Sequence, residues 1–344
     1  MSDPYGLGRV MGEPGVLPQR AQKLDASLPA RPDELCVEVE SLNVDAASFK
    51  QIKEAAGGDS ARMIEDILAI VRSRGKMQNP VTGSGGMLIG RVREVGAQHP
   101  AHGRLSPGDR IASLVSLSLT PLVIDEVRAI HPAIDRVDVR GHAFLFGTGL
   151  YAKLPTDMPD TLALAALDVC GAPALVARYV KPGSKVAVIG AGKSGALCLA
   201  QARRMLGEKG TLMALDVSTR ALETLKDLGL CDLALALDAT RAVDVMQKVS
   251  DATGGALCDL VVNCASVPNT EMASILSVRD GGTVIFFSMA TSFTAAALGA
   301  EGVGKDVTMI VGNGYVPGHA DLTLNLLRDS PRLRRLFEER YAKA

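Results

Sequence analysis

Apolar and polar positions follow a strand-like pattern near the start of the chain. Apolar residues alternate with polar or small ones over Leu35–Leu42, which is typical of a strand with one buried face. We expect Asn43 and Asp45 to lie where this strand opens into a loop. Apolar runs on either side of a Pro-Gly-Asp turn predict two further strands, over Met87–Val95 and Arg110–Leu117.

A helical stripe interrupts this pattern. Apolar residues over Met63–Val71 recur at helical spacing, so a helix is predicted from a cap at Asp59 or Ser60 to Arg74. Gly75 can end this helix, and a polar, glycine-rich loop follows. The first ~150 residues are therefore predicted to form a mainly β domain with one inserted helix.

Beyond residue 185 the pattern changes to short β-rich runs separated by helical stretches. Such alternation predicts a parallel, doubly wound sheet. We expect its strands over Lys185–Ile189, Thr211–Asp216, Leu233–Leu237, Asp259–Asn263, Thr283–Ser288 and Val307–Val311, followed by helices near Ala320–Arg328 and from Pro331 onward. The chain is thus predicted to be an α/β protein with two domains, over residues 1–155 and 156–344.

The composition narrows the class of protein. Of the 344 residues, 47% are hydrophobic and 22% charged, and the net charge is -1, so we expect a globular protein that does not bind nucleic acid. No apolar stretch approaches the ~18 residues of a membrane span, and Met1–Val10 lacks the pattern of an export signal. We therefore expect a cytoplasmic protein without membrane contact. Its six scattered cysteines are expected to be reduced core thiols.

A glycine motif follows the first strand of the second domain. The continuous apolar run Val186–Ile189 leads directly into Gly190-Ala191-Gly192-Lys193-Ser194-Gly195, which fits the dinucleotide-binding fingerprint in its expected context. Gly190 permits a tight turn, and Gly192 lets the backbone approach a pyrophosphate. Gly195 lets the helix pack closely on the strand, while Lys193 can contact a phosphate.

An acidic residue ends the next strand, 21 positions after the last glycine of the motif (216 − 195). This residue, Asp216, is expected to accept hydrogen bonds from the adenosine ribose and to repel a 2′-phosphate, which favours NAD over NADP. Arg220 nearby leaves some use of NADP open, and an ordinary strand-capping role for Asp216 is the structural alternative. By position at the strand ends, the other expected cofactor neighbours are Val217, Ser218, Asn263, Cys264, Ala265, Ser288, Met289 and Ala290.

Two strings in the first domain, Gly90–Gly96 and Pro107–Ile111, together with this nucleotide domain, resemble the medium-chain dehydrogenase/reductase superfamily. The resemblance implies a GroES-like first domain and a Rossmann second domain. Zinc-dependent members have Gly-His-Glu where this chain has Gly85-Gly86-Met87, and no cysteine lies around Asn43. We therefore expect no metal site.

Longer strings resemble one family in particular, the L-erythro-3,5-diaminohexanoate dehydrogenases of bacterial lysine fermentation. They are Gly75–Gly90, Leu114–Leu122, Ala165–Ala174, Val267–Ile275 and Phe286–Gly314. The resemblance implies NAD-dependent oxidative deamination of a small diamino acid, with release of ammonia. We also expect a homo-oligomer, either a dimer or a tetramer.

That reaction requires a base near the reacting amine and a group that positions water. Asp45, Lys76 and Asp168 are the candidates: either aspartate can be the base or bind the distal ammonium, and Lys76 can be a base or bind the carboxylate. Their structural alternatives are a loop cap, a solvated lysine and a charge at a helix N-terminus, respectively. The expected substrate-binding residues are Asn79, Thr82, Ser84 and Glu271.

Two other functions fit the same motifs. One is a zinc-free quinone or enoyl reductase that uses NAD(P)H, although Asp216 argues against NADPH. The other is a non-catalytic NAD-binding protein, in which the polar loop before Gly86 would serve no reaction.

Overall fold

The computed structural model describes residues 2–312 and 314–342, which form two compact units. Unit 1 extends to Leu164 and unit 2 begins at Ala165, so the division falls within helix α3, Asp160–Leu167. The domain boundary expected after residue 155 lies just past strand β6 and stays a prediction.

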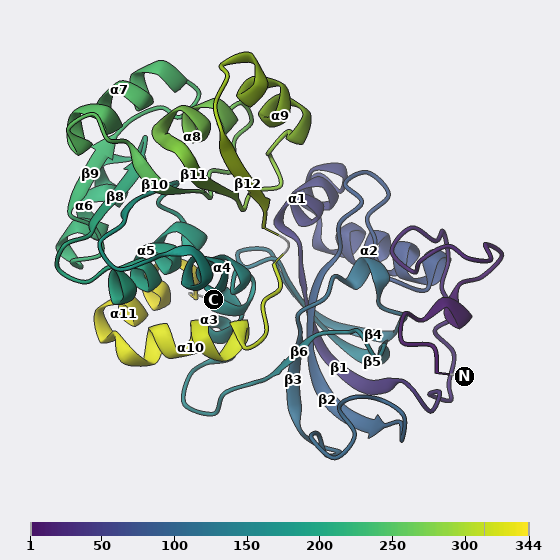
Figure 1. The fold of residues 1–344 in the computed structure, drawn as a ribbon. Coiled ribbons are helices and arrows are strands. Elements are labelled where there is room, and N and C mark those ends of the chain that lie inside the picture. The colour runs from purple at the N-terminus through teal and green to yellow at the C-terminus, as the bar shows by residue number, and fades with distance from the viewer. Residues whose placement is uncertain (1, 313, 343–344) are drawn as a thin grey trace. The chain divides into compact units, whose positions relative to one another are not determined.

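Unit 1 is built on an antiparallel sheet of six strands in the order β4-β5-β1-β2-β3-β6 (Figure 1). The central strand β1 pairs with β2 and β5, so that Leu35 lies opposite both Val95 and Leu145. The strands are β1 Leu35–Val44, β2 Gly86–Val95, β3 Arg110–Ser113, β4 Leu122–His131, β5 Arg136–Leu145 and β6 Tyr151–Lys153. Strand β3 ends four residues before the predicted Leu117 (117 − 113), where the 3-10 helix η2, Leu117–Leu119, begins.

Two helices, not one, lie between β1 and β2. The predicted helix is confirmed as α2, Ser60–Arg74, with Asp59 as its N-cap and Gly75 as its C-cap. The expected loop at Asn43 and Asp45 is wrong: Asn43 lies within β1, and Asp45 is the single residue between β1 and α1, Ala46–Ala55. The side chain of Asp45 caps α1 by accepting a hydrogen bond from Ala47 N.

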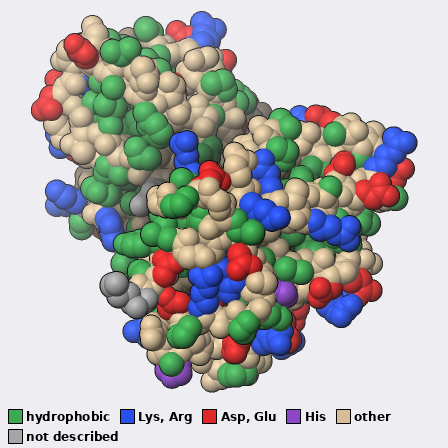
Figure 2. All heavy atoms as spheres, turned by 90° about the vertical axis from the view of Figure 1, so that its right-hand side faces the viewer, with side chains coloured by type: hydrophobic (Ala, Val, Ile, Leu, Met, Phe, Trp, Pro, Cys, Tyr) green, Lys and Arg blue, Asp and Glu red, His purple; other side chains and the backbone are tan. Residues whose placement is uncertain are grey.

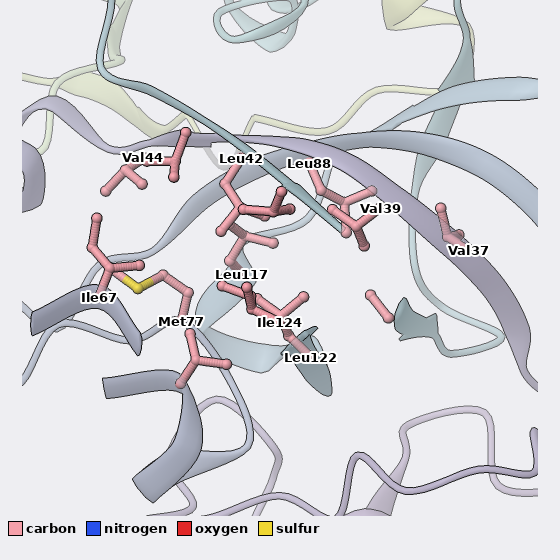
Figure 3. Close-up of a cluster of buried hydrophobic side chains, with 14 of the residues drawn as sticks. Val37, Val39, Leu42, Val44, Ile67, Met77, Leu88, Leu117, Leu122 and Ile124 are labelled. Carbon is pink, nitrogen blue, oxygen red and sulfur yellow. The ribbon is translucent and has the colours of Figure 1, made fainter. Parts of the chain in front are cut away.

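The core of unit 1 joins these helices to the sheet. Val44 of β1, Ile67 of α2 and Met77 of the following loop are all buried in one apolar cluster (Figure 3). The apolar residues of α2 therefore cover one face of the strands, as their helical spacing predicts. The buried side chain of Met77 anchors the loop after α2 to the core, next to the polar residues of this loop.

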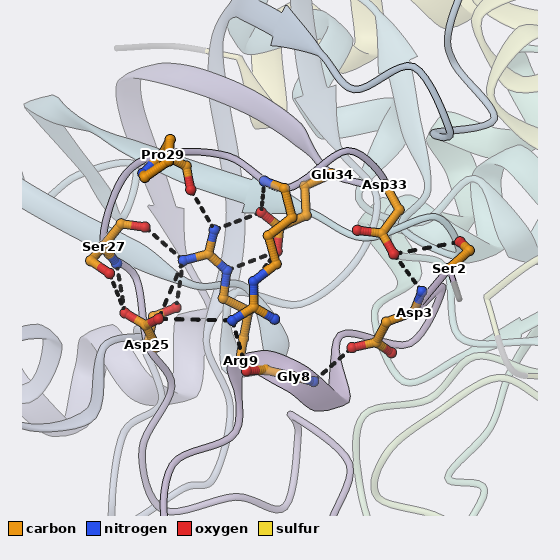
Figure 4. A network of polar contacts seen from close by, with 10 residues as sticks. Ser2, Asp3, Gly8, Arg9, Asp25, Ser27, Pro29, Asp33 and Glu34 are labelled. Carbon is orange, nitrogen blue, oxygen red and sulfur yellow. Dashed lines mark hydrogen bonds and ion pairs between the residues drawn. The ribbon is translucent and has the colours of Figure 1, made fainter.

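The segment before β1 is held by a buried arginine. All five N–H groups of Arg9 have acceptors: Glu34 takes two hydrogen bonds, at 2.7 and 2.6 Å, and the carbonyls of Asp25, Ser27 and Pro29 take the others (Figure 4). Its guanidinium carbon also lies 4.1 Å from the ring centre of Phe144. The first 34 residues, whose one helix is the short η1, Leu7–Arg9, are thereby tied to the sheet.

Unit 2 confirms the predicted doubly wound parallel sheet. Its strands lie in the order β12-β11-β10-β7-β8-β9, so the order reverses between β7 and β10. The strands are β7 Lys185–Ile189, β8 Thr211–Asp216, β9 Leu233–Ala236, β10 Cys258–Asn263, β11 Val278–Phe286 and β12 Val307–Val311. Strand β11 begins five residues before the predicted Thr283 (283 − 278).

Helices cover both faces of this sheet (Figure 1). Helices α7, α8 and α9 lie on one face, and α4, α5, α10 and α11 lie on the other. The helices of unit 2 are α4 Gly171–Tyr179, α5 Lys193–Leu206, α6 Thr219–Asp227, α7 Ala242–Thr253, α8 Glu271–Ser277, α9 Phe293–Gly302, α10 His319–Asp329 and α11 Pro331–Tyr341.

The face drawn in Figure 2 mixes acidic and basic side chains and has no continuous basic area. Across the described residues, no single helix is long and apolar enough to span a membrane. The two helices α3 and α4, which meet at a bend of 48°, are together long and apolar enough for a membrane span, but only by length and composition.

The buried arginine gives a test of stability. Arg9→Met should lower the free energy of unfolding by about 3–5 kcal/mol, because the buried Glu34 would lose its bidentate partner and keep only its contacts with Arg31. Urea denaturation of the purified variant measures this, with the exposed Arg72→Met as the control. The double variant Arg9→Met/Glu34→Gln should recover part of the loss. Equal stability of wild type and Arg9→Met would show that Arg9 does not stabilise the fold.

Candidate functional site

The glycine motif of unit 2 forms a tight turn from β7 into α5. Gly190 has a φ of 97°, and a Cβ on Gly195 would lie 1.8 Å from Gly190 O, so the helix rests directly on the turn. Gly192 is the N-cap of α5 and has no side-chain capping bond, and a Cβ built there would meet nothing within 4 Å. The first N–H groups of α5 have no acceptor within the helix. This arrangement fits a pyrophosphate of a dinucleotide.

Asp216, at the end of β8, supports this turn with both carboxylate oxygens. Oδ2 accepts from Ala191 N at 2.7 Å, and Oδ1 accepts from Ser218 N at 2.8 Å. Each oxygen keeps further acceptor capacity, which is what a ribose with two hydroxyls requires. Val217 next to it is 71% exposed, so an apolar side chain is open to contact with a bound ligand beside Asp216.

The predicted cofactor neighbours after β10 form a clamp. Asn263 is buried, and its amide donates to Thr270 and to Ser274 Oγ, while its Oδ1 accepts from Ala265 N. Cys264 N donates to Ile189 O, which brings this loop against the glycine turn. The side chain of Asn263 thus fixes the shape of this loop.

The loop after β11 is more open. Ser288 Oγ accepts from Ala290 N at 3.2 Å, and Met289 between them is fully exposed. Glu271, at the start of α8, is buried and accepts from Ser292 N at 2.7 Å, just before α9. Its carboxylate is therefore engaged in joining α8 to α9.

Asp168 lies beside the glycine turn as well. Its Oδ2 is 2.6 Å from the Nζ of Lys193, the first residue of α5, and both side chains are partly exposed. The sequence singled out both residues but did not predict that they pair. This ion pair holds the lysine at the end of α5 where a phosphate would bind.

In unit 1 the structure brings together three predicted residues and one that was not predicted. Ser84 Oγ donates to Asp45 Oδ1 at 3.0 Å and lies 2.6 Å from Ser48 Oγ, which in turn lies 2.6 Å from Thr82 Oγ1. Ser48 is buried in the first turn of α1, whereas Thr82 and Asp45 are exposed. Thr82 Oγ1 also lies 3.1 Å from Ser84 Oγ, so the three hydroxyls form a connected chain that ends on the carboxylate of Asp45.

Asn79 supports the loop that carries these hydroxyls. Its Oδ1 accepts from Val81 N and Thr82 N, and its Nδ2 donates to Gln51 Oε1 and Ser48 O. All its hydrogen-bonding positions are thus used within the protein, and the side chain is buried.

Lys76 is also buried, and its Nζ donates to the carbonyls of Pro18 and Gln19, at 2.7 and 3.3 Å. Burial, and then the charge of Arg74, lower the pKa of its amine to about 8. The lysine thereby ties the N-terminal segment to the loop after α2. In this position it is shielded from solvent.

The start of β2 packs against the end of β1 without room for side chains. Gly86 has a φ of 113°, and a Cβ there would lie 2.1 Å from Asn43 O. This position matches the histidine of Gly-His-Glu in zinc-dependent superfamily members, so a histidine ligand does not fit this backbone. Among the residues described, no group of three or more His, Cys, Asp or Glu is arranged to hold a metal ion.

Comparisons with known proteins agree with this geometry. Residues 8–155 match the family model described as the L-erythro-3,5-diaminohexanoate dehydrogenase N-terminal domain. The chain is 52% identical over 338 residues to the L-erythro-3,5-diaminohexanoate dehydrogenase of Acetoanaerobium sticklandii, with 98% of each chain covered. It is 51% identical over 341 residues to that of Fusobacterium nucleatum, again with 98% of each covered. The chain belongs to the L-erythro-3,5-diaminohexanoate dehydrogenase family.

Solved structures are similar in fold. The alcohol dehydrogenase TADH from Thermus sp. ATN1 has a TM-score of 0.53 at 19% identity, with 92% of this chain and 88% of that chain covered. A mycobacterial quinone oxidoreductase has a TM-score of 0.55 at 20% identity, with 96% and 87% covered. The predicted GroES-like and Rossmann architecture is confirmed, and this member of the diaminohexanoate dehydrogenase family is an oxidoreductase that uses a nicotinamide cofactor. Membership of this family supports neither of the two alternatives, a quinone or enoyl reductase and a non-catalytic NAD-binding protein.

The buried lysine of this family member gives a test by pH. The unfolded amine has a pKa of about 10.4, so between pH 8 and 10 the unfolded chain binds more protons and stability rises with pH. Lys76→Met removes this effect. From pH 7.5 to 9.5 the stability of wild type relative to Lys76→Met should rise by about 2 kcal/mol, measured by urea denaturation. A pH-independent difference, as expected for the exposed control Lys50→Met, would show that Lys76 is not responsible.

Proposed function

We propose that this protein catalyses the NAD-dependent oxidative deamination of L-erythro-3,5-diaminohexanoate to 5-amino-3-oxohexanoate and ammonia. The observation that carries the proposal is the 52% identity over 98% of a relative with this name. NAD, when bound, supplies the hydride acceptor. The protein must hold the substrate, take a proton from its reacting amine and position a water molecule.

We propose Asp45 as the group that takes the proton. Its carboxylate is exposed and accepts hydrogen bonds from Ala47 N and Ser84 Oγ, so it is oriented but open. Of the other candidates, Lys76 is buried against backbone carbonyls, and Asp168 is paired with Lys193. Asp168 is better suited to orient Lys193 toward the pyrophosphate.

The predicted substrate-binding residues divide into two kinds. Thr82 and Ser84 present hydroxyls on a glycine-rich loop, and we propose that Thr82 contacts the substrate. Asn79 and Glu271 are buried and bonded within the protein, so we propose that they support the loop and α9, respectively.

We propose NAD as the specific cofactor because Asp216 places a carboxylate beside the glycine turn. A 2′-phosphate there would meet like charge. We further propose that the reaction is metal-free, since the backbone at Gly86 leaves no space for a histidine ligand. All six cysteines are free thiols, which supports the expected cytoplasmic location.

We propose a homo-oligomer, as a dimer or tetramer, on the basis of the edge strand β12. Within residues 2–312 and 314–342 this strand pairs only with β11, and it contains no charged residue. Met309 and Val311 on it are 36% and 56% exposed. Soluble proteins cover or charge such edges, and a second copy of the chain would cover this one.

The activity is tested with the purified protein, NAD and L-erythro-3,5-diaminohexanoate. NADH absorbance should rise with equal release of ammonia, and exhaustive chelation should leave the rate intact. The analogue 3-aminohexanoate, which lacks the second ammonium, is the control and should react more slowly. If no NADH forms, the proposed function fails.

Cofactor preference is tested by Asp216→Asn, which removes the charge but keeps the size of the side chain. The ratio of kcat/KM for NAD to that for NADP should fall by about tenfold or more, because the repulsion of the 2′-phosphate is lost. Asp251→Asn, on the exposed surface of α7, is the control. An unchanged ratio would remove Asp216 from this role.

A further inference from the structure

The hydroxyl chain of unit 1 has a direction that its chemistry imposes. A carboxylate only accepts hydrogen bonds, so Ser84 gives its single hydroxyl hydrogen to Asp45. The shortest contacts then lead through Ser48: Ser84 Oγ accepts from Ser48 at 2.6 Å, and Ser48 Oγ accepts from Thr82 at 2.6 Å. The direct contact between Thr82 Oγ1 and Ser84 Oγ is longer, at 3.1 Å. The other acceptor near the Ser48 hydroxyl, Ser84 O, lies farther away at 3.3 Å. The hydrogens therefore all point from Thr82 toward Asp45.

The middle of this chain is shielded, and its two ends are open. Ser48 is fully buried and Ser84 is half-buried, whereas Thr82 and Asp45 are exposed. Among the contacts described for these four side chains, Asp45 is the single charged group. At the Thr82 end the oxygen accepts from Ser84 N at 3.4 Å, and because its own hydrogen points inward it keeps its second lone pair for an outside donor.

We propose that Thr82, Ser48 and Ser84 form a proton relay to Asp45, with Ser48 as its positioning residue. The inference rests on the proposed function, since the donor is the reacting ammonium of a substrate. A proton passes from the ammonium nitrogen to Thr82 Oγ1, and the hydrogens of Thr82, Ser48 and Ser84 each move one oxygen along. The last hydrogen protonates Asp45. The products are a neutral amine and an aspartic acid, and each hydroxyl keeps one hydrogen.

The hydroxyl of Ser48 is not needed to support the loop, so a proton relay accounts for its position. Asn79 already fixes the loop through four hydrogen bonds, two of them to the backbone of the loop. Ser48 adds contacts between side-chain hydroxyls at 2.6 Å, the short separation at which proton transfer between oxygens is easiest.

The test follows the pH dependence of two variants. Ser48→Ala leaves only the longer contact between Thr82 and Ser84, and Thr82→Val removes the first hydroxyl. Ser48→Ala and Thr82→Val should lower kcat by about tenfold or more near pH 7, with KM changed less than about threefold. The loss should shrink as the pH approaches 10, because the substrate then arrives as a free amine and needs no relay. The solvent deuterium isotope effect on kcat should reflect several moving protons in wild type and should decrease in Ser48→Ala.

Two controls separate the relay from simple damage. Thr82→Ser keeps the hydroxyl and should keep the wild-type pH profile. Ser41→Ala removes another buried serine of unit 1, one that is not part of the hydroxyl chain.

A loss of kcat in Ser48→Ala that is the same at every pH, or a loss below twofold, would overturn the relay. If wild type itself does not reduce NAD with the diamine, the proposed function fails and the relay falls with it. An active wild type whose variants lose activity independently of pH overturns the relay alone.

Discussion

The close approach of the β1 and β2 backbones is the constraint on which the unit 1 site depends. Neither Gly85 nor Gly86 has room for a side chain, because Cβ atoms there would lie 2.4 Å from Met77 O and 2.1 Å from Asn43 O. Asp45 N also donates to Gly85 O, so the end of one strand is fixed to the start of the other. The same contact that excludes a histidine at Gly86 thus sets the distance between Asp45 and the loop hydroxyls.

Unit 2 contains a similar close contact between backbone segments at its glycine turn. Backbone contact between Gly190 and Gly195 leaves the end of α5 open, and a carboxylate at a strand end supports the turn. In each unit, then, glycines bring two backbone segments together, and an aspartate beside them accepts hydrogen bonds from the adjoining loop. Neither aspartate is buried, so both keep acceptor capacity for a substrate or cofactor.

The sequence predicted most where local chemistry decides the structure. Strands β7, β8 and β12 and helix α2 have the predicted bounds because their apolar spacing and caps are local signals. Helix α1 was missed although Asp45 is a good N-cap and Phe49 and Ile52 mark an apolar face. Ser48 could not be found, because it meets Ser84, 36 positions away, only through the pairing of β1 with β2. The burial of Lys76 likewise depends on carbonyls 57 and 58 residues earlier.

The attachment of the N-terminal segment has a consequence for the order of events during synthesis. Its carbonyls accept from Lys76, and its Arg9 stacks on Phe144. Both partners leave the ribosome long after the segment does. The hydrogen-bond acceptors of Arg9 all lie within the first 34 residues and are made with the segment, whereas its contact with Phe144 must wait for β5. A chain released early, before β5 is complete, would lack this contact, and its first 34 residues would be held less firmly and be more open to proteases.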